Sequence, residues 1–366
     1  MYVITGLHTG GAEIRLQDLL SRLDREKFDP VIVSIIPIGK IGKEIVNRGD
    51  KVIFLNMKRK LGFLFVFFRF LRIIKKEKPD IIHSHLFHAN ILARLAKIFN
   101  RKIKIISSIR NENIGGKNRE IFLRMTDSLS DITNTISENV TQKMIEKKVA
   151  PANRIITVYN GIDVNKFYPN REKGEEIKKN LKIEKRLPIL ISVGRLSRAK
   201  GYYYLIESIE KLKQKYPDVV LLILGEGKEK DKLEKQIEQK GLKNNIFLLG
   251  NKDNVCDYLN SADLFVSSSI WEGLPTVILE AMACNLPVVA TRVGGVEEIM
   301  RNNNSKFLAK PGEVEDLFDK INLFLSLSKD EKEEIVKNNR KLVEKEFSLD
   351  RMAREYTNVY NKLIHS

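Results

Sequence analysis

Short apolar, β-branched runs alternate along this chain with segments whose apolar positions recur every three to four residues. In the first half the runs lie at 2–5, 31–35, 52–55, 81–83 and 103–108. Strand-like runs that alternate with amphipathic helices indicate βαβ units and a parallel sheet. The first half therefore predicts a doubly wound α/β domain.

The rhythm breaks at Asn160-Gly161-Ile162-Asp163, a turn signal that leads into a polar stretch at 166–186 without a strand pattern. It then resumes, with apolar runs at 189–193, 219–224, 246–249, 264–267, 287–291 and 305–308. We predict two Rossmann-like domains, over 1–165 and 166–347, and a C-terminal helix over 348–366 that packs back towards the first domain. Open parallel sheets bind ligands at the carboxyl ends of their strands, so we expect a ligand site in a cleft between the two domains.

The charge of the chain is uneven. Of a net charge of +17, most lies in residues 1–165, where 29 Lys and Arg stand against 16 Asp and Glu, compared with 35 against 31 in the rest. A basic half attracts polyanions, which are nucleic acid, an anionic lipid surface or a phosphate-bearing substrate. No nucleic-acid-binding motif accompanies the charge, so we expect no nucleic-acid partner.

Two features favour a cytoplasmic protein. The sequence contains two cysteines, without disulfide or zinc spacing, and its first residues resemble a strand more than a signal peptide. The most apolar stretch, 61–74, contains Arg69 and Arg72 and is too short to span a bilayer.

The sharpest motif runs from Trp271 to Glu280, where seven residues separate the carboxylates of Glu272 and Glu280. An apolar strand at 264–267 precedes it, Gly273 permits close backbone approach, and Pro275 suits the first turn of a helix. Free N–H groups at such a start can bind an anion. Alternatively, Glu280 only caps a helix or lies on its solvated face, and Glu272 is an exposed loop acid.

Three other patterns follow strands. Arg195 and Lys200 come after the 189–193 run, where two cations suit a diphosphate, and the alternative is a solvated basic loop. Gly10 and Gly11 follow the first strand and would let a ligand approach the next helix, but a plain tight turn fits equally. Alternation places His83 and His85 on one strand face, where either could form a hydrogen bond to a substrate. For His83 we favour a buried core histidine whose hydrogen bonds are made within the protein. No third ligand lies nearby, so no metal site is expected.

In this combination the chain resembles glycosyltransferase family 4, the group 1 retaining glycosyltransferases of the GT-B fold, of the bacterial surface-polysaccharide type. The resemblance rests on motifs in the family's order: Gly10-Gly11-Ala12-Glu13, Pro79-Asp80-Ile81-Ile82-His83-Ser84-His85, Ser137-Glu138, Asn160-Gly161-Ile162-Asp163, Gly194-Arg195 with Lys200, and Glu272 with Glu280.

The resemblance implies roles for particular residues. Arg195 and Lys200 would hold the donor diphosphate, Glu280 the nucleotide ribose and Glu272 the donor sugar. Backbone amides of Gly273, Leu274 and Pro275 would lie near the sugar and phosphate. The family's glycine loop, which faces the β-phosphate and the acceptor, falls on Gly10 and Gly11, and its active-site histidine falls on His85.

The resemblance also implies the reaction. A hexose or N-acetylhexosamine would pass with retention from a nucleotide-diphosphate sugar, for which we expect UDP, to a hydroxyl of a lipid-linked glycan in cell-surface polysaccharide synthesis. Neither metal nor cofactor is expected, because Arg195, Lys200 and helix N-termini would stabilise the departing diphosphate. Alternatives are a non-catalytic GT-B protein that binds a sugar nucleotide or a polyanion, and a sugar-nucleotide epimerase.

Residues 58–78 combine an apolar run containing four phenylalanines with flanking Lys and Arg. This pattern suits a helix at an anionic bilayer surface, which would make the protein peripheral on the inner face of the membrane. An ordinary crossover helix packed on the sheet explains the pattern equally well, and both hold if one face packs while the other is exposed.

Overall fold

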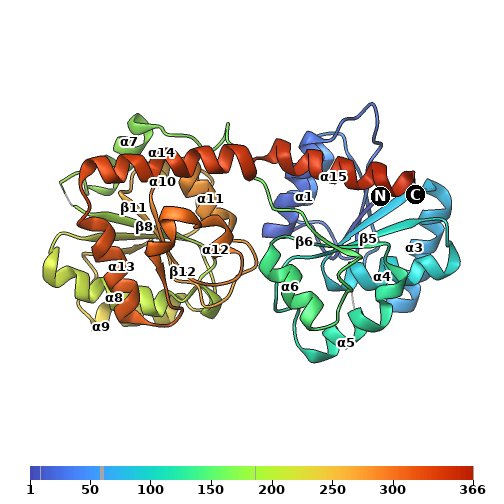
Figure 1. Ribbon diagram of the computed structural model, residues 1–366, viewed down its shortest axis with the longest axis horizontal. Helices are drawn as coiled ribbons and strands as arrows, with labels where there is room; N and C mark the ends of the chain where they lie inside the picture. Colours follow the sequence, from blue (N-terminus) through green and yellow to red (C-terminus); the bar gives the residue numbers. More distant parts are fainter. Residues whose placement is uncertain (9, 58–61, 186, 366) are drawn as a thin grey trace. The chain divides into compact units, whose positions relative to one another are not determined.

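The computed structural model describes residues 1–8, 10–57, 62–185 and 187–365, which form two compact units (Figure 1). The N-terminal unit comprises Met1–Gly161 together with Leu349–Ser366, and the C-terminal unit comprises Ile162–Ser348. Each unit is a parallel sheet with helices on both faces (Figure 1). The predicted fold class, two doubly wound α/β domains, is confirmed.

The sheet of the N-terminal unit contains seven parallel strands in the order β3-β2-β1-β4-β5-β6-β7. The strands are β1 (Tyr2–Ile4), β2 (Val31–Ser34), β3 (Lys51–Phe54), β4 (Ile81–His85), β5 (Lys104–Ile109), β6 (Ile132–Thr135) and β7 (Ile155–Thr157). The helices are α1 (Gly11–Arg22), α2 (Lys40–Asn47), α3 (Phe63–Glu77), α4 (Phe87–Phe99), α5 (Lys117–Thr126), α6 (Glu138–Glu146) and, from the far end of the chain, α15 (Leu349–Ile364).

The sheet of the C-terminal unit contains six parallel strands in the order β10-β9-β8-β11-β12-β13. The strands are β8 (Ile189–Val193), β9 (Val220–Leu224), β10 (Ile246–Leu248), β11 (Leu264–Ser267), β12 (Val288–Thr291) and β13 (Leu308–Ala309). The helices are α7 (Arg171–Leu181), α8 (Tyr202–Lys215), α9 (Lys230–Gln239), α10 (Val255–Leu259), α11 (Thr276–Ala283), α12 (Val296–Ile299), α13 (Val314–Leu325) and α14 (Lys329–Glu346).

The sequence pattern and the structure differ at three strands. β6 and β7 were not predicted, because each has only three or four residues and polar side chains interrupt β6. The strand expected at 305–308 is mostly a 3-10 helix, Asn302–Phe307, and extended backbone begins only at Leu308. Apolar residues in a short run do not distinguish these conformations.

Alternation along β1 builds a core on each face of the N-terminal sheet. Tyr2 and Ile4 pack in a cluster with α1 and α15, whereas Val3 packs on the opposite face with α3 and α4. Because both faces are covered, every residue of β1 is buried. The last helix of the chain therefore completes the core of the first unit.

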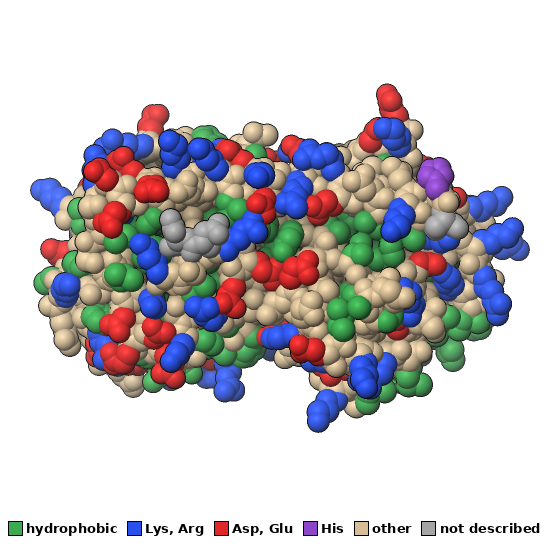
Figure 2. Space-filling model, viewed as in Figure 1, with side chains coloured by type: hydrophobic (Ala, Val, Ile, Leu, Met, Phe, Trp, Pro, Cys, Tyr) green, Lys and Arg blue, Asp and Glu red, His purple; other side chains and the backbone are tan. Residues whose placement is uncertain are grey.

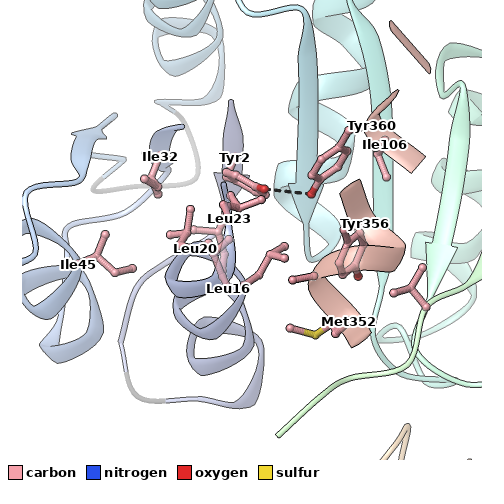
Figure 3. Close-up of a cluster of buried hydrophobic side chains, with 14 of the residues drawn as sticks. Tyr2, Leu16, Leu20, Leu23, Ile32, Ile45, Ile106, Met352, Tyr356 and Tyr360 are labelled. Carbon is pink, nitrogen blue, oxygen red and sulfur yellow. Dashed lines mark hydrogen bonds between the residues drawn. The ribbon is translucent and has the colours of Figure 1, made fainter. Parts of the chain in front are cut away.

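A chain of buried hydrogen bonds ties α15 to this sheet. Figure 3 shows the first of them, between the hydroxyls of Tyr2 and Tyr360. The hydroxyl of Tyr360 lies 3.0 Å from the Tyr2 hydroxyl and 2.8 Å from His83 Nδ1. His83 Nε2 lies 2.8 Å from Ser108 Oγ, which donates to Asn134 Oδ1. Because Ser108 uses its proton to donate to Asn134, it accepts from His83 Nε2–H, and in the neutral ring Nδ1 then accepts from the Tyr360 hydroxyl. Burial agrees with this, because it holds the pKa of His83 well below its usual value.

Replacing Tyr360 with Phe should destabilise the N-terminal unit by about 1–3 kcal/mol, because Tyr2 and His83 would then be buried without their partner. Hydrogen exchange of β1 and β4 amides under increasing denaturant measures this change. Asn358→Ala, an exposed position on the same helix, is the control and should change stability by less than about 0.5 kcal/mol. Equal protection in the two variants would show that the network contributes nothing.

Candidate functional site

In the C-terminal unit, Lys200 and Glu272 meet beyond the carboxyl ends of two neighbouring strands. Lys200 follows β8 and Glu272 follows β11, and these strands pair in the sheet. Lys200 Nζ lies 2.5 Å from Glu272 Oε1, and Ser269 Oγ donates to the same oxygen at 2.9 Å. The side chains of the pair are 20% and 16% exposed, so the carboxylate is held in place while remaining accessible.

Backbone contacts join the loops that carry this pair. Ser268 Oγ donates to the carbonyl of Lys200 at 2.9 Å, and the Ile270 amide donates to the Ala199 carbonyl at 2.7 Å. Thr291, at the end of β12, donates its hydroxyl to the carbonyl of Ser269 at 2.6 Å. The loops after β8 and β11 are thus connected to each other and to the end of β12.

Two glycines make this close packing sterically feasible. Gly201 has φ +62°, and a Cβ there would lie 2.0 Å from the Ser268 carbonyl oxygen. Gly294 has φ +51°, and a Cβ there would lie 2.2 Å from the Glu272 carbonyl oxygen. Only glycine fits at such distances and at these positive φ values. The loop at Glu272 is consequently held from two sides.

The remaining residues of the Glu272–Glu280 motif lie in the loop and in α11. Gly273, Leu274 and Pro275 are buried, and Pro275 is the residue that precedes the helix rather than part of its first turn. Glu280 lies in the middle of α11 and is 9% exposed. The carboxylates thus have different environments: Glu272 lies in a loop, and Glu280 lies on a mostly buried helix face.

Arg195 differs from Lys200. It lies in the loop after β8 with an exposed side chain, and within the described part of the chain that side chain has no hydrogen bond or ion pair. The structure therefore brings Lys200 together with Glu272 but leaves the guanidinium of Arg195 in solvent. An arginine without a partner can bind phosphate oxygens through two N–H groups.

In the N-terminal unit, His85 ends β4 and its side chain is 0% exposed. Its Nδ1 lies 3.0 Å from Nη2 of Arg110, which also donates through Nη1 to Asn160 Oδ1 at 3.1 Å. Since arginine only donates, Nδ1 is the acceptor and the proton is on Nε2. Burial is the main reason that the pKa of His85 lies well below its usual value, and the neighbouring His83 and Arg110 lower it further. The ring is therefore neutral.

Arg110 was not among the predicted site residues. It follows β5 just as His85 ends β4, and β4 pairs with β5. Adjacent parallel strands place the residues after them side by side, so the position after Ile109 was the signal that could have identified Arg110. Asn160, its second partner, was recognised as a turn but not as a partner for a cation.

The glycine loop is only partly described. Thr9 lies outside the described residues, Gly10 precedes α1, and Gly11 is its first residue. A Cβ on Gly10 would lie 2.5 Å from Glu13 Oε2, whereas a Cβ on Gly11 would have no atom within 4 Å. The structure thus leaves open space beside Gly11. Among the described residues, no group of three or more His, Cys, Asp or Glu could hold a metal ion.

Comparisons with known proteins identify the family of the chain. A family model described as Glycosyltransferase Family 4 matches residues 9–166, and one described as Glycosyl transferases group 1 matches residues 173–342. The chain is 32% identical over 274 residues to an uncharacterized glycosyltransferase of Methanocaldococcus jannaschii, a match that covers 69% of this chain and 65% of that protein. It is 26% identical over 310 residues to the capsular polysaccharide biosynthesis glycosyltransferase CapH of Staphylococcus aureus, with 82% of each chain covered.

The fold is shared with a solved structure, Alr3699/HepE from Anabaena in complex with UDP. That structure has a TM-score of 0.86, 21% sequence identity and 99% coverage of both chains. Together, the two family models cover most of the N-terminal unit and most of the C-terminal unit. The chain therefore belongs to the group 1 glycosyl transferases, the family 4 glycosyltransferases of the GT-B fold.

Proposed function

We propose that this protein is a retaining glycosyltransferase that moves a hexose or N-acetylhexosamine from a UDP-sugar to a hydroxyl of a lipid-linked glycan. The observation that carries the proposal is the Lys200–Glu272 pair, held by joined loops at the carboxyl edge of the second sheet. The similarity to a capsular polysaccharide biosynthesis enzyme supports a role in cell-surface polysaccharide synthesis. The shared fold of a UDP complex supports the choice of nucleotide.

The donor would lie against the loops of the C-terminal unit. Arg195 and Lys200 would neutralise the diphosphate, backbone amides from Gly273 to Pro275 would face the sugar and phosphate, and Glu280 would bind the ribose. Glu272, whose Oε1 already accepts from Lys200 and Ser269, has Oε2 to accept from sugar hydroxyls. Because Glu272 offsets the charge of Lys200, Arg195 would supply more of the free positive charge.

Transfer would depend on stabilising the leaving group. Negative charge grows on the diphosphate as the bond to the sugar breaks, and Arg195 with Lys200 would offset it without a metal ion. A phosphate oxygen would take the proton of the acceptor hydroxyl on the face from which the diphosphate leaves, which retains the configuration.

In the N-terminal unit, Gly10 and Gly11 would let the backbone approach the β-phosphate and the acceptor. His85 would donate a hydrogen bond through Nε2–H, because Nδ1 faces Arg110. Direct contact with substrate requires neighbouring side chains to move, since His85 is fully buried. Because Nδ1 already accepts from Arg110 and Nε2 carries the proton, His85 would act as a hydrogen-bond donor and not as a base.

The nucleotide assignment predicts that UDP binds in the presence of a chelator, and that Arg195→Ala weakens binding by about tenfold to a hundredfold through the loss of charged hydrogen bonds. Calorimetric titration with UDP, GDP and ADP measures this effect. Arg195→Ala is the cleaner single variant, because Lys200→Ala also leaves Glu272 without its partner and so changes more than the diphosphate contact. Lys232→Ala, exposed on α9 of the same unit, is the control. Unchanged affinity in an Arg195→Ala, Lys200→Ala double variant would place the diphosphate elsewhere.

Gly294→Ala should displace the Glu272 loop and weaken UDP binding, because a Cβ would lie 2.2 Å from the Glu272 carbonyl oxygen. Trp271, the single tryptophan of the chain, adjoins Glu272 and reports the displacement through its fluorescence. Gly241→Ala is the matched control, since Gly241 has φ +63° but no atom near a Cβ, and strain alone costs about 1–2 kcal/mol. Identical emission spectra of the two variants would contradict the packing argument.

We propose that α3 brings the N-terminal unit to an anionic membrane surface. One face of α3 packs in the core through Val66, Phe67 and Phe70. The other exposes apolar and basic side chains, which are Leu64, Phe65, Phe68, Arg72, Lys75 and Lys76. Figure 2 shows hydrophobic and basic side chains close together on the surface of this unit. Apolar side chains beside cations suit the headgroup region of a bilayer.

Two other observations bear on this surface. None of the helices in the described ranges is both long and apolar enough to span a bilayer. Residues 58–61, which include the basic cluster before α3, lie outside the described residues. The surface proposal therefore depends on α3 itself.

Vesicles that contain anionic lipid should bind the protein, and Phe65→Ser with Phe68→Ser should reduce partitioning by at least about tenfold, because two exposed aromatic side chains are lost. Co-sedimentation at low and moderate salt measures the partitioning. Tyr203→Ser, which removes an exposed aromatic side chain from the C-terminal unit, should leave it unchanged. Equal partitioning of wild type and the double variant would contradict a role for α3.

A further inference from the structure

The N-terminal unit contains a second feature at the carboxyl edge of its sheet, a pocket of about 330 Å³. It opens beside the ends of β1, β4 and β5, and its lining comes entirely from this unit. The lining includes polar, basic and apolar side chains, among them Thr5, Phe87, Asn90, Arg110, Ile114 and Arg119. This volume is at the small end of ligand sites, which suits a single sugar or a group of similar size.

The lining of the pocket contains two arginines and neither Asp nor Glu. Arg110 donates to His85 and Asn160, which are both neutral, and Glu13 acts on it only at a distance. Arg119 lies over the ring of Phe87 and donates to a backbone carbonyl. Within the described residues, neither guanidinium has an ion pair.

Another arginine of the same unit, Arg94, provides a comparison. Arg94 is fully buried, and Asp127 lies 3.8 Å from its guanidinium. Buried cations are generally paired, because desolvation is costly. Among the described residues, no carboxylate forms an ion pair with Arg110, although its side chain is largely removed from solvent, so no direct partner balances its positive charge.

Three polar atoms around the pocket are buried and have no hydrogen-bond partner within the described residues: Thr5 Oγ1, Asn90 Oδ1 and Arg110 Nε. Asn90 is 1% exposed, and its Nδ2 already donates to the Ser108 carbonyl at 3.0 Å. Its Oδ1 therefore needs a donor, whereas Arg110 Nε needs an acceptor. A ligand that carries both a hydroxyl and an anionic oxygen would satisfy both requirements.

Taken with the proposed transferase function, on which this inference rests, these features identify the acceptor's chemistry. We propose that this pocket binds a sugar of the acceptor that carries a carboxylate or a phosphate, with the anion on Arg110 and Arg119 and a hydroxyl on Asn90. Phe87 and Ile114 provide the apolar surface on which the C–H face of a sugar ring packs. A neutral sugar would leave the charge of Arg110 unbalanced, so the pocket discriminates against it.

Three matched sugars test the proposal: D-glucose, D-glucuronate and D-glucose 6-phosphate. Full-length protein is titrated with each by calorimetry, with and without saturating UDP. We expect at least one charged sugar to bind about tenfold or more tightly than glucose, the gain expected of a charge-assisted pair. Arg119→Gln should abolish this preference. Arg124→Gln, an exposed position on the same helix that does not line the pocket, should retain it.

Each outcome has a defined meaning. Binding of only the phosphate or only the carboxylate sugar supports the proposal and identifies the anion. Equal binding of all three, an equal loss in the Arg124→Gln variant, or no binding of any of them overturns it. If that failure occurs in protein that binds UDP, the donor assignment stands. If the charged sugars bind but UDP does not, the pocket is supported and the proposed transferase function fails. Arg110→Gln is a second test, with circular dichroism as a check on folding.

Discussion

The parallel arrangement of strands determines where chemistry is concentrated in both units. Every strand of a parallel sheet ends at the same edge, so the residues that follow neighbouring strands are brought together whatever their distance in sequence. Lys200 and Glu272 are 72 positions apart and meet because β8 pairs with β11. His85 and Arg110 are 25 positions apart and meet because β4 pairs with β5.

The carboxyl edges of the two sheets differ in how their positive charges are balanced and hydrated. In the C-terminal unit, the ammonium of Lys200 is balanced by the carboxylate of Glu272, and the exposed Arg195 remains hydrated. In the N-terminal unit, Arg110 is largely desolvated and its hydrogen-bond partners are neutral. A hydrated cation binds an anion in exchange for water, whereas a desolvated one has already lost that hydration. The second arrangement is therefore the more selective for anions.

Much of the fold follows from local pattern, because buried parallel strands are continuous apolar runs. β8 and β11 were predicted to the residue for this reason, and β9 to within one. β6 was missed because Thr133, Asn134 and Thr135 make it polar. The structure explains why polar residues occur there: Asn134 accepts hydrogen bonds from Ser108 and from Tyr356 of α15. A polar strand that is satisfied by a distant helix has no signature in its own sequence.

The candidate site was predictable in part, for a related reason. Glu272 and Lys200 stand in recognisable motifs, but their ion pair depends on strand order, which the motifs do not contain. Gly294, which supports the Glu272 loop, lies 22 residues further along and belongs to the loop after another strand. Arg110 lacked a motif altogether, and only its position after a strand marks it. The sequence therefore indicated which types of residue form the site, but not which of them contact one another.

The connection of α15 to the first unit has a consequence for how the chain folds. Tyr360 is 358 positions from Tyr2 and 277 from His83, yet its hydroxyl contacts both. Contacts of such separation form late, because the intervening chain must first be closed into a loop. The C-terminal unit has its sheet and its own helices within Ile162–Ser348 and does not depend on this contact. The surroundings of His85 and Arg110, two residues beyond His83 and Ser108, are therefore completed only when α15 docks.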